Sequence, residues 1–230
     1  GGSAPEVGTD LDGALRFALD HRDGADGRIH TFLGPHSPYI CPPPFLRRVA
    51  DLAHSHALPL HIHAAESAEQ VARSQQQYGR SPIAHLDDCG LFADAAQRPC
   101  VVAHALCLSD ADVAILAARR VRVAHCPITY MKLAMPMAGG DPARLLAAGV
   151  DVALGTDGPG SNNDMDMKAV VRCAPLLQKY HARDAQALAG DLPLRMATQA
   201  GARALGFAQS GVLSVGRPAD LILIDLDQPH

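Results

Sequence analysis

Five apolar runs of strand length recur along the chain, and helical sequence follows each of them after a gap of variable length. The runs cover residues 28–34, 58–63, 100–104, 121–125 and 150–155. Short apolar runs that alternate with helical periodicity are typical of strands in a parallel sheet with helices on its faces. The pattern therefore predicts an α/β fold built from repeated strand-then-helix units.

Sequence signals for helices lie in the segments between and after the apolar runs. Residues 45–57 carry apolar side chains on one face, and further helices are expected over about 164–181 and 193–205. Pro175 should kink or break the first of these two. Three polar start signals precede the other helices: Ser67 with Gln70, Ser109 with Asp112, and Asp141 before Pro142. His54, His56 and His85 fall on helices or helix ends and are expected at the surface.

The last part of the chain has a different pattern. Residues 211–225 predict a turn and then a β-strand, with nothing helical after it. We therefore divide the chain into 1–207, the (β/α) part, and 208–230, a strand segment of a separate small β element. Five parallel units are fewer than the eight of a closed barrel, and open sheet edges are rarely left uncovered. We expect the chain to be a piece of a longer protein.

Composition narrows the class of protein. Apolar residues make up 48% of the 230 residues, aromatics only 4%, and tryptophan is absent, so the core should be aliphatic. The net charge of −4 and the lack of a Lys/Arg cluster argue against a nucleic-acid surface. No apolar run approaches the roughly 20 residues of a membrane span, and no secretory signal begins the chain. Six cysteines without a Cys-x-x-Cys pair indicate reduced thiols in a cytoplasmic protein.

Side chains that bind metals or move protons end several of these runs. His63, with Glu66 just beyond it, follows the second run, and His104 and Asp157 follow the third and fifth. Barrel enzymes collect catalytic groups from the carboxyl ends of different strands, and a hydrolase that uses a metal-bound water needs imidazole and carboxylate ligands. The plainer alternatives are a core histidine at 63, a first-turn carboxylate at 66 and a turn residue at 157.

Two further histidines need separate interpretation. His61 and His63 stand two apart on a strand and so point the same way. We expect His61 to be a structural imidazole near the metal and not a ligand. His125 ends the fourth run just before Pro127, and we expect it to line the floor of the pocket.

The ordered set of motifs resembles the amidohydrolase superfamily, and within it the 5-methylthioadenosine/S-adenosylhomocysteine deaminases and their chlorohydrolase relatives. The carrying stretches are His36-Ser-Pro-Tyr39, His61-Ile-His-Ala-Ala-Glu66, Ala103-His104, His125-Cys-Pro127, Met131-Lys-Leu133 and Leu154-Gly-Thr-Asp-Gly-Pro-Gly-Ser-Asn-Asn163. The closing stretch, Gly216-Arg-Pro-Ala-Asp-Leu-Ile-Leu-Ile224, is similar to the return strand of the family's small β-sandwich.

The resemblance implies a partial (β/α)8 TIM-type barrel, strands four to eight, followed by the start of a C-terminal β-sandwich element. It implies Zn²⁺, with Fe²⁺ or another divalent metal as alternatives, held by His63 and Asp157. Glu66, His104 and Asp157 would be catalytic, and His36 and Ser161 would contact substrate. The implied reaction is hydrolytic deamination of an amino-substituted purine or similar heterocycle. The family's first-strand His-x-His has no counterpart here, so the chain alone should bind metal poorly.

One loop departs from the deaminase pattern. Cys126, Thr129 and Tyr130 stand where these deaminases tend to carry amide side chains or serine. A chlorohydrolase, an alkylaminohydrolase or a guanine-type deaminase on the same site therefore stays open, as does a catalytically inactive barrel that serves as a scaffold. The expected partner is a small amino-heterocycle, with no nucleic acid and no membrane, and a homo-oligomer is left open.

Overall fold

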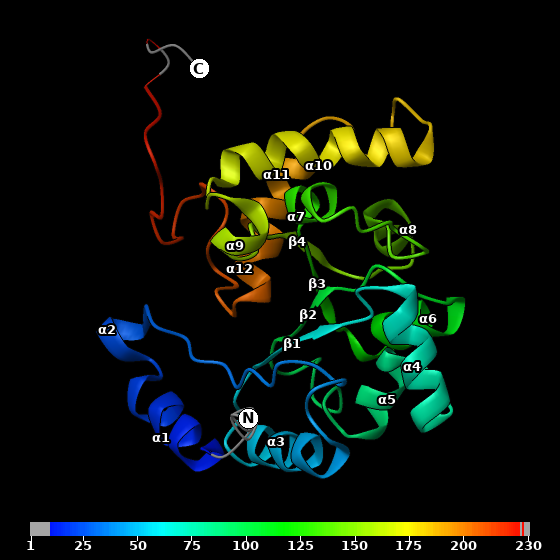
Figure 1. Cartoon of the computed structure of the whole chain (residues 1–230). Helices are drawn as coiled ribbons and strands as arrows, with labels where there is room; N and C mark the ends of the chain where they lie inside the picture. The colour runs from blue at the N-terminus through cyan, green and yellow to red at the C-terminus, as the bar shows by residue number, and fades with distance from the viewer. Residues whose placement is uncertain (1–9, 226, 228–230) are drawn as a thin grey trace.

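The fold is built on one parallel sheet. The computed structural model describes residues 10–225 and 227. Four strands, all parallel and hydrogen-bonded in chain order, are β1 (Leu60–Ala64), β2 (Cys100–His104), β3 (Arg122–His125) and β4 (Val152–Leu154). These strands confirm four of the five predicted runs and the α/β class (Figure 1).

Helices occupy most of the connections. They are α1 (Leu11–His21), α2 (Gly24–Gly27), α3 (Pro43–Ser55), α4 (Ala68–Tyr78), α5 (Pro82–Asp88), α6 (Asp110–Arg119), α7 (Pro127–Lys132), α8 (Pro142–Ala147), α9 (Pro159–Asn162), α10 (Met167–Ala182), α11 (Leu192–Arg195) and α12 (Gly201–Ala204), with a π-helical turn, Met196–Ala200, between the last two. The predicted caps are confirmed, since Ser67, Ser109 and Asp141 each accept a backbone N–H of the helix they begin.

The two faces of the sheet carry different side chains. The outer face presents large aliphatic residues to the helices, and every one is buried: Leu60, Ile62, Val102, Val123, Val152 and Leu154. The opposite face carries His61 and His63 on β1, followed by Val101 and Ala103 on β2 and by Arg122 and Ala124 on β3. Here Val101 and Ala153 pack against Ala200 and Ala204 of the C-terminal helices. The histidines of β1 are therefore not part of the aliphatic core.

The first predicted strand, 28–34, is wrong in extent. Only Leu33 forms a ladder contact, a parallel bridge to Leu60, while residues 34–36 run beside β1. The carbonyls of Leu33 and His36 accept the N–H groups of His61 and His63. Gly34 and Pro35 interrupt the ladder at this edge, because proline has no N–H to contribute.

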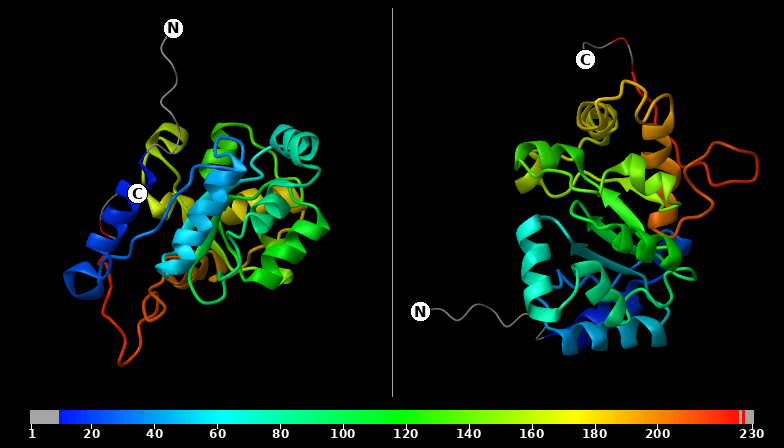
Figure 2. Two further views of the ribbon diagram at one scale, coloured as in Figure 1. Left: turned by 90° about the horizontal axis from the view of Figure 1, so that it is seen from below. Right: turned by 90° about the vertical axis from the view of Figure 1, so that its right-hand side faces the viewer.

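The predicted strand in 211–225 does not form in the described residues. Its apolar side chains are open to solvent, with Leu223 93% exposed, and Figure 2 shows the segment, orange to red, leaving the body of the molecule. A strand needs a neighbour to take its backbone hydrogen bonds, and none of the described elements offers one. The segment beyond Asp225 lies largely outside the described residues.

Two smaller expectations also need correction. Pro175 lies inside α10, which runs continuously from Met167 to Ala182, so the helix does not break there and only the predicted kink stays a prediction. His85 is buried, with its ring stacked on Tyr78 at 3.9 Å, so it is not a surface residue. Its helix, α5, packs between α4 and α6, which the helical pattern alone did not indicate.

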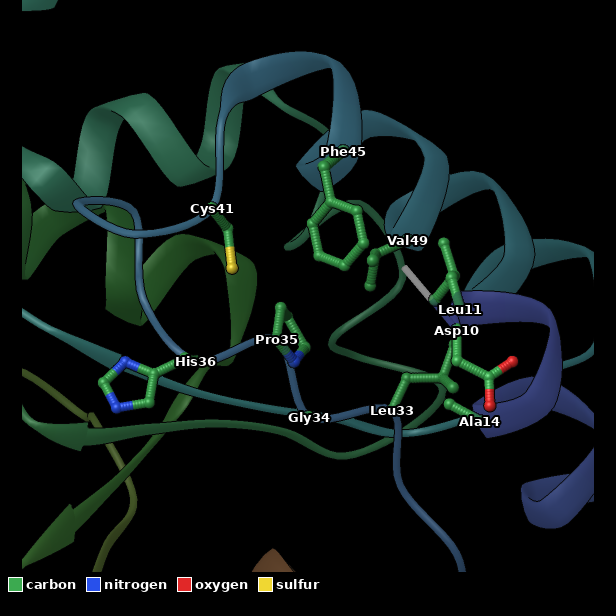
Figure 3. A pocket seen from close by; sticks show the side chains of 10 residues that line it. All are labelled: Asp10, Leu11, Ala14, Leu33, Gly34, Pro35, His36, Cys41, Phe45 and Val49. Atoms are coloured by element: carbon green, nitrogen blue, oxygen red, sulfur yellow. The ribbon is translucent and has the colours of Figure 1, made fainter. Parts of the chain in front are cut away.

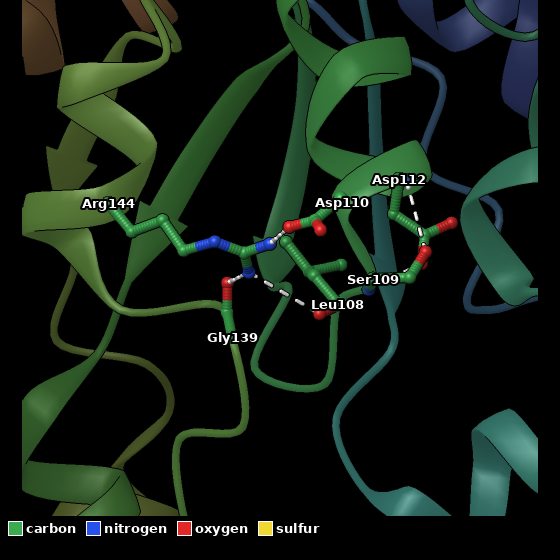
Figure 4. A network of polar contacts seen from close by, with 6 residues as sticks. All are labelled: Leu108, Ser109, Asp110, Asp112, Gly139 and Arg144. Atoms are coloured by element: carbon green, nitrogen blue, oxygen red, sulfur yellow. Dashed lines mark hydrogen bonds and ion pairs between the residues drawn. The ribbon is translucent and has the colours of Figure 1, made fainter.

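The buried carboxylate of Asp112 caps the start of α6, and its removal leads to a prediction about stability. Asp112 is 2% exposed and accepts the Ser109 N–H at 2.9 Å and the Ser81 hydroxyl, while the exposed Asp110 pairs with Arg144 (Figure 4). Asp112→Ala should lower the free energy of unfolding by about 1–3 kcal/mol, because it removes the hydrogen bonds that a buried carboxylate accepts from Ser109 and Ser81. Asp110→Ala on the same helix turn should cost about 1 kcal/mol or less. Urea unfolding of both variants checks this, and equal losses would contradict it.

A second aspartate predicts how stability depends on pH. Hydrogen bonds from His54 and Arg98 hold the pKa of Asp94 below its ordinary value of 3.8. A depressed pKa in the folded state stabilises the fold above the unfolded pKa, and the contribution is lost as pH falls through the folded value. Asp94→Asn should therefore flatten the fall in stability below about pH 4, measured by unfolding at a series of pH values. Parallel curves for the two proteins would show that Asp94 does not contribute.

Candidate functional site

The carboxyl ends of the four strands bring the predicted residues to one edge of the sheet. His63 lies near the end of β1, His104 and His125 end β2 and β3, and Asp157 lies just beyond β4. The ring centroids of His63 and His104 are 5.4 Å apart and nearly parallel, and His61 lies 6.3 Å from His63. Parallel strands end on the same side, so residues far apart in the chain meet here.

His63 has one ring nitrogen already engaged. Its Nδ1 lies 2.8 Å from the His36 carbonyl oxygen, so Nδ1 carries the proton and donates. The lone pair is then on Nε2, which leaves that atom available as a ligand. A ring N–H donated to a backbone carbonyl is the usual way in which a metal-binding imidazole is oriented.

His36 lies beside His63 and also borders a separate cavity. The two ring centroids are 4.8 Å apart, and His36 Nδ1 lies 3.0 Å from the Ser37 hydroxyl. The cavity, of about 360 Å³, opens between α1 and α3, and His36 stands at its end (Figure 3). None of Glu66, His104 and Asp157 lines this cavity.

The environment of Glu66 disfavours the charged form of its carboxyl group. It is half-buried, and burial raises its pKa above the ordinary value, with a further rise from the Asp157 carboxylate. A hydrogen bond with Gln70 opposes this shift without cancelling it. The Glu66 N–H donates to Gln70 Oε1 at 2.9 Å, which fixes the residue just ahead of α4.

Asp157 has the opposite electrostatics. Burial alone would raise its pKa, but the Ser161 hydroxyl, the Gly158 N–H and the nearby His104 lower it below the ordinary value. The Gly158 N–H donates to Asp157 Oδ1 at 2.7 Å. The Ser161 hydroxyl lies 3.1 Å from the Gly158 carbonyl oxygen, and its effect on the pKa of Asp157 places it beside that carboxylate. Two carboxyl groups with pKa values pushed in opposite directions suit different steps of acid–base chemistry.

Strained backbone gathers at the same edge. Ala65, His104, Ala105 and Asp157 all have φ between 51° and 73°, a region that residues other than glycine seldom occupy. Each such residue costs of order 1–3 kcal/mol, and strain of this kind clusters at functional sites. The strain follows β1, β2 and β4, where the chain turns sharply out of the sheet.

His104 and His125 are both buried and lack a partner on one ring nitrogen. No described protein atom pairs with His104 Nδ1 or with His125 Nε2. Burial lowers the pKa of His104 to about 4 and that of His125 to about 3, so both rings are neutral in the protein alone. His125 lies near His104 and Tyr130, and its place on the floor of the site stays a prediction.

Three residues that follow β3, at the start of α7 and within it, contribute more to the packing around the site than the sequence indicated. Tyr130 is buried against the rings of His104 and His125, and its hydroxyl accepts the Cys126 N–H at 2.8 Å. Lys132 Nζ donates to the Gly160 carbonyl at 3.1 Å and to Asn163, which ties the β3 loop to the β4 loop. The departure from the family pattern at 126 and 130 was the available signal, but it pointed to substrate choice and not to packing.

The residues fit part of a zinc site. Imidazole and carboxylate are zinc ligands, and the bond from His63 Nδ1 to the His36 carbonyl leaves the lone pair of Nε2 for that role. Within residues 10–225 and 227, however, no three His, Cys, Asp or Glu side chains lie close enough to hold one ion. A catalytic zinc usually has three protein ligands, so His63 and Asp157 would form an incomplete set by themselves.

Comparison with known proteins places these features in a wider group. The family model described as the amidohydrolase family matches residues 14–230. A 5-methylthioadenosine/S-adenosylhomocysteine deaminase of Pelotomaculum thermopropionicum is 44% identical over 220 residues, which are 96% of this chain and 49% of that protein. The chain thus spans about half the length of the curated relatives it matches.

The chain is also similar in fold to solved structures of a deaminase and a chlorohydrolase. An adenosine deaminase from Xanthomonas campestris, solved with bound zinc, superposes with a TM-score of 0.83 at 40% identity over 91% of this chain and 46% of that one. An atrazine chlorohydrolase from Arthrobacter aurescens, also with zinc, gives a TM-score of 0.78 at 26% identity over 90% and 46%. No helix in the described part of the chain has the length and apolarity to cross a bilayer.

Proposed function

This chain belongs to the amidohydrolase family, and from that premise we propose that it provides half of the active site of a zinc-dependent aminohydrolase. The substrate would be an adenosine-like purine such as methylthioadenosine or S-adenosylhomocysteine, and the reaction the hydrolytic release of ammonia. The observation that carries the proposal is the convergence of His63, Glu66, His104 and Asp157 at one sheet edge, with the two carboxyl groups shifted in opposite directions.

The proposed chemistry divides between the two carboxyl groups. Zinc, held by His63 Nε2 and Asp157 together with ligands from outside the described residues, would lower the pKa of a bound water toward about 7. Glu66 donates its proton to the ring nitrogen next to the amino-bearing carbon, while the water oxygen bonds to that carbon. Asp157 takes one of the water's protons and delivers it to the amine, so the C–N bond breaks and ammonia leaves. The remaining hydroxyl proton returns to Glu66 as the ring carbonyl forms. His104 is placed to polarise the attacking water.

The remaining site residues would hold the substrate. His36 lies against His63, and Ser161 lies against Asp157, so each adjoins a proposed zinc ligand. We therefore propose both as substrate contacts. The Nδ1 atom of His36 is occupied by the Ser37 hydroxyl at 3.0 Å, which orients the ring.

We also propose the larger architecture from the same premise. The strands β1–β4 would be barrel strands five to eight, with the Leu33 segment as strand four and residues 1–207 as the second part of the barrel. Residues 208–230 would contribute a strand to a small β-sandwich, whose other strands would cover the exposed apolar side chains of 221–224. The six free cysteines, five of them buried, fit a cytoplasmic enzyme. A homo-oligomer stays open.

A second reaction on the same site has one observation in its favour. Cys126 and Tyr130 replace the residues typical of the deaminases, and the atrazine chlorohydrolase structure resembles this chain along 90% of its length. Loss of chloride or an alkylamine from a triazine would use the same two carboxyl groups. A catalytically inactive scaffold is less well supported, because His63, Glu66 and Asp157 are all present.

Metal analysis and a substrate panel test the proposal. The whole protein should purify with near-stoichiometric zinc and release ammonia from adenosine-like substrates faster than from guanine or triazines. Absence of metal would contradict the zinc site, and preferential turnover of a triazine would support the second reaction instead. The chain by itself should retain little zinc on dialysis, because it contributes only two of the ligands.

A further inference from the structure

We propose that Tyr130 is a positioning residue, which holds His104 in place and couples it through Cys126 to the loop that carries Asp157. The inference deepens the proposed function and rests on it for the catalytic roles of His104 and Asp157. Tyr130 touches neither substrate nor metal in this proposal, and it acts through the residues it packs against.

Tyr130 is held at both ends. Its side chain is 2% exposed, and its hydroxyl accepts the Cys126 N–H at 2.8 Å, four residues back at the start of α7. Its ring meets His125 edge-on, with centroids 5.0 Å apart and an interplanar angle of 70°. A buried phenol with its oxygen engaged and its ring packed against aromatic neighbours has little freedom to move.

The His104 ring depends on this packing for its orientation. One side of the ring faces His63 at 5.4 Å and 22°, and the edge of Tyr130 meets it at 5.9 Å and 68°. His104 Nδ1 has no described protein partner, so no hydrogen bond at that atom fixes the ring. The neighbouring rings are left to set the direction in which the imidazole points.

Cys126 extends the contact to the Asp157 loop. Its side chain is 4% exposed, and a Cβ built on Gly155 would lie 3.2 Å from the Cys126 sulfur. The sulfur therefore packs directly on the backbone that leads from β4 to Asp157. A shift of Tyr130 would move Cys126 through the hydrogen bond between the Cys126 N–H and the Tyr130 hydroxyl. It would therefore disturb His104 and Asp157 together.

A purely structural role for Tyr130 makes a different prediction. A side chain that only fills the core, or only satisfies the first N–H of α7, would affect unfolding and leave the geometry of His104 unchanged. The test therefore compares Tyr130→Phe, which keeps the ring and removes the hydroxyl, with Tyr180→Phe, the same exchange at a position that is 86% exposed on α10.

The experiment uses the zinc-loaded whole protein with ¹⁵N-labelled histidine. In Tyr130→Phe the imidazole signals of His104, assigned by their loss in His104→Asn, should shift or broaden, while Tyr180→Phe leaves them in place. The value of kcat should fall about 10- to 100-fold with KM within about threefold, since small misplacements of catalytic groups have effects of this size. Zinc content should be unchanged in both variants.

Superimposable His104 signals in Tyr130→Phe would overturn the proposal, whatever the turnover. Where Tyr130→Phe does not fold, Gly155→Ala tests the same contact from the other side, because its methyl group presses on the Cys126 sulfur and should also move the His104 signals. A wild-type protein without aminohydrolase turnover would refute the proposed function, and the His104 signals would still decide the positioning role.

Discussion

Exchange of Glu66 for glutamine in the whole protein should lower kcat by about 10²–10⁴, the range that a placed general acid contributes. Glutamine keeps the shape of the side chain and cannot donate a carboxyl proton. The raised pKa of Glu66 comes chiefly from burial, and a shift in this direction suits a general acid. Steady-state ammonia release measures the effect, and zinc content should not change, because Glu66 is not a proposed ligand.

Glu69 offers a matched control. It lies in the first turn of α4, three residues beyond Glu66, and it is exposed. Glu69→Gln should leave kcat within about twofold, since a carboxylate at a solvated helix start contributes only to the helix dipole. Equal turnover in Glu66→Gln and wild-type protein would refute the proposed acid.

Asp157→Asn should lower kcat at least as much as Glu66→Gln does, and it should also lower the amount of zinc that the protein retains. Loss of the carboxylate removes the proposed proton acceptor, worth about 10²–10⁴ in kcat, and also removes a proposed charged zinc ligand. Asparagine tolerates the φ of 60° at this position and keeps an oxygen for the Gly158 N–H, so the loop should retain its shape. Zinc retained after dialysis and kcat are the two measurements.

The control for Asp157 is Asp164→Asn in the exposed segment that follows α9. This variant should keep zinc and turnover at wild-type values. Full zinc occupancy in Asp157→Asn would remove the carboxylate from the ligand set, and full turnover would remove it from the proton transfers. The two readouts therefore separate the two roles assigned to one residue.

Much of the fold could be predicted because its signals are local. The strands at 60–64, 100–104, 122–125 and 152–154 follow from short apolar runs, and Ser67, Ser109 and Asp141 marked helix starts through side chains that reach backbone only a few residues away. The first strand and the tail were less predictable, since a strand exists only when a neighbour pairs with it. Leu33 reaches β1 for a single bridge, and the described structure offers the tail no partner.

The sequence by itself determined which side chains could carry the chemistry. His63, Glu66, His104 and Asp157 were recognised because each follows an apolar run, and their order along the chain matched a family pattern. Periodicity and motif order are properties of neighbouring residues, so no three-dimensional information was needed to find them.

Only the tertiary structure decided how those side chains behave. The orientation of the His63 ring by the His36 carbonyl, the effect of Asp157 on the pKa of Glu66, the effect of His104 on the pKa of Asp157 and the packing of Tyr130 on His104 all depend on groups distant in the chain. Burial and electrostatic coupling act through space, and a linear pattern does not encode which groups will face one another. The parallel sheet supplied that arrangement by ending its strands on one side.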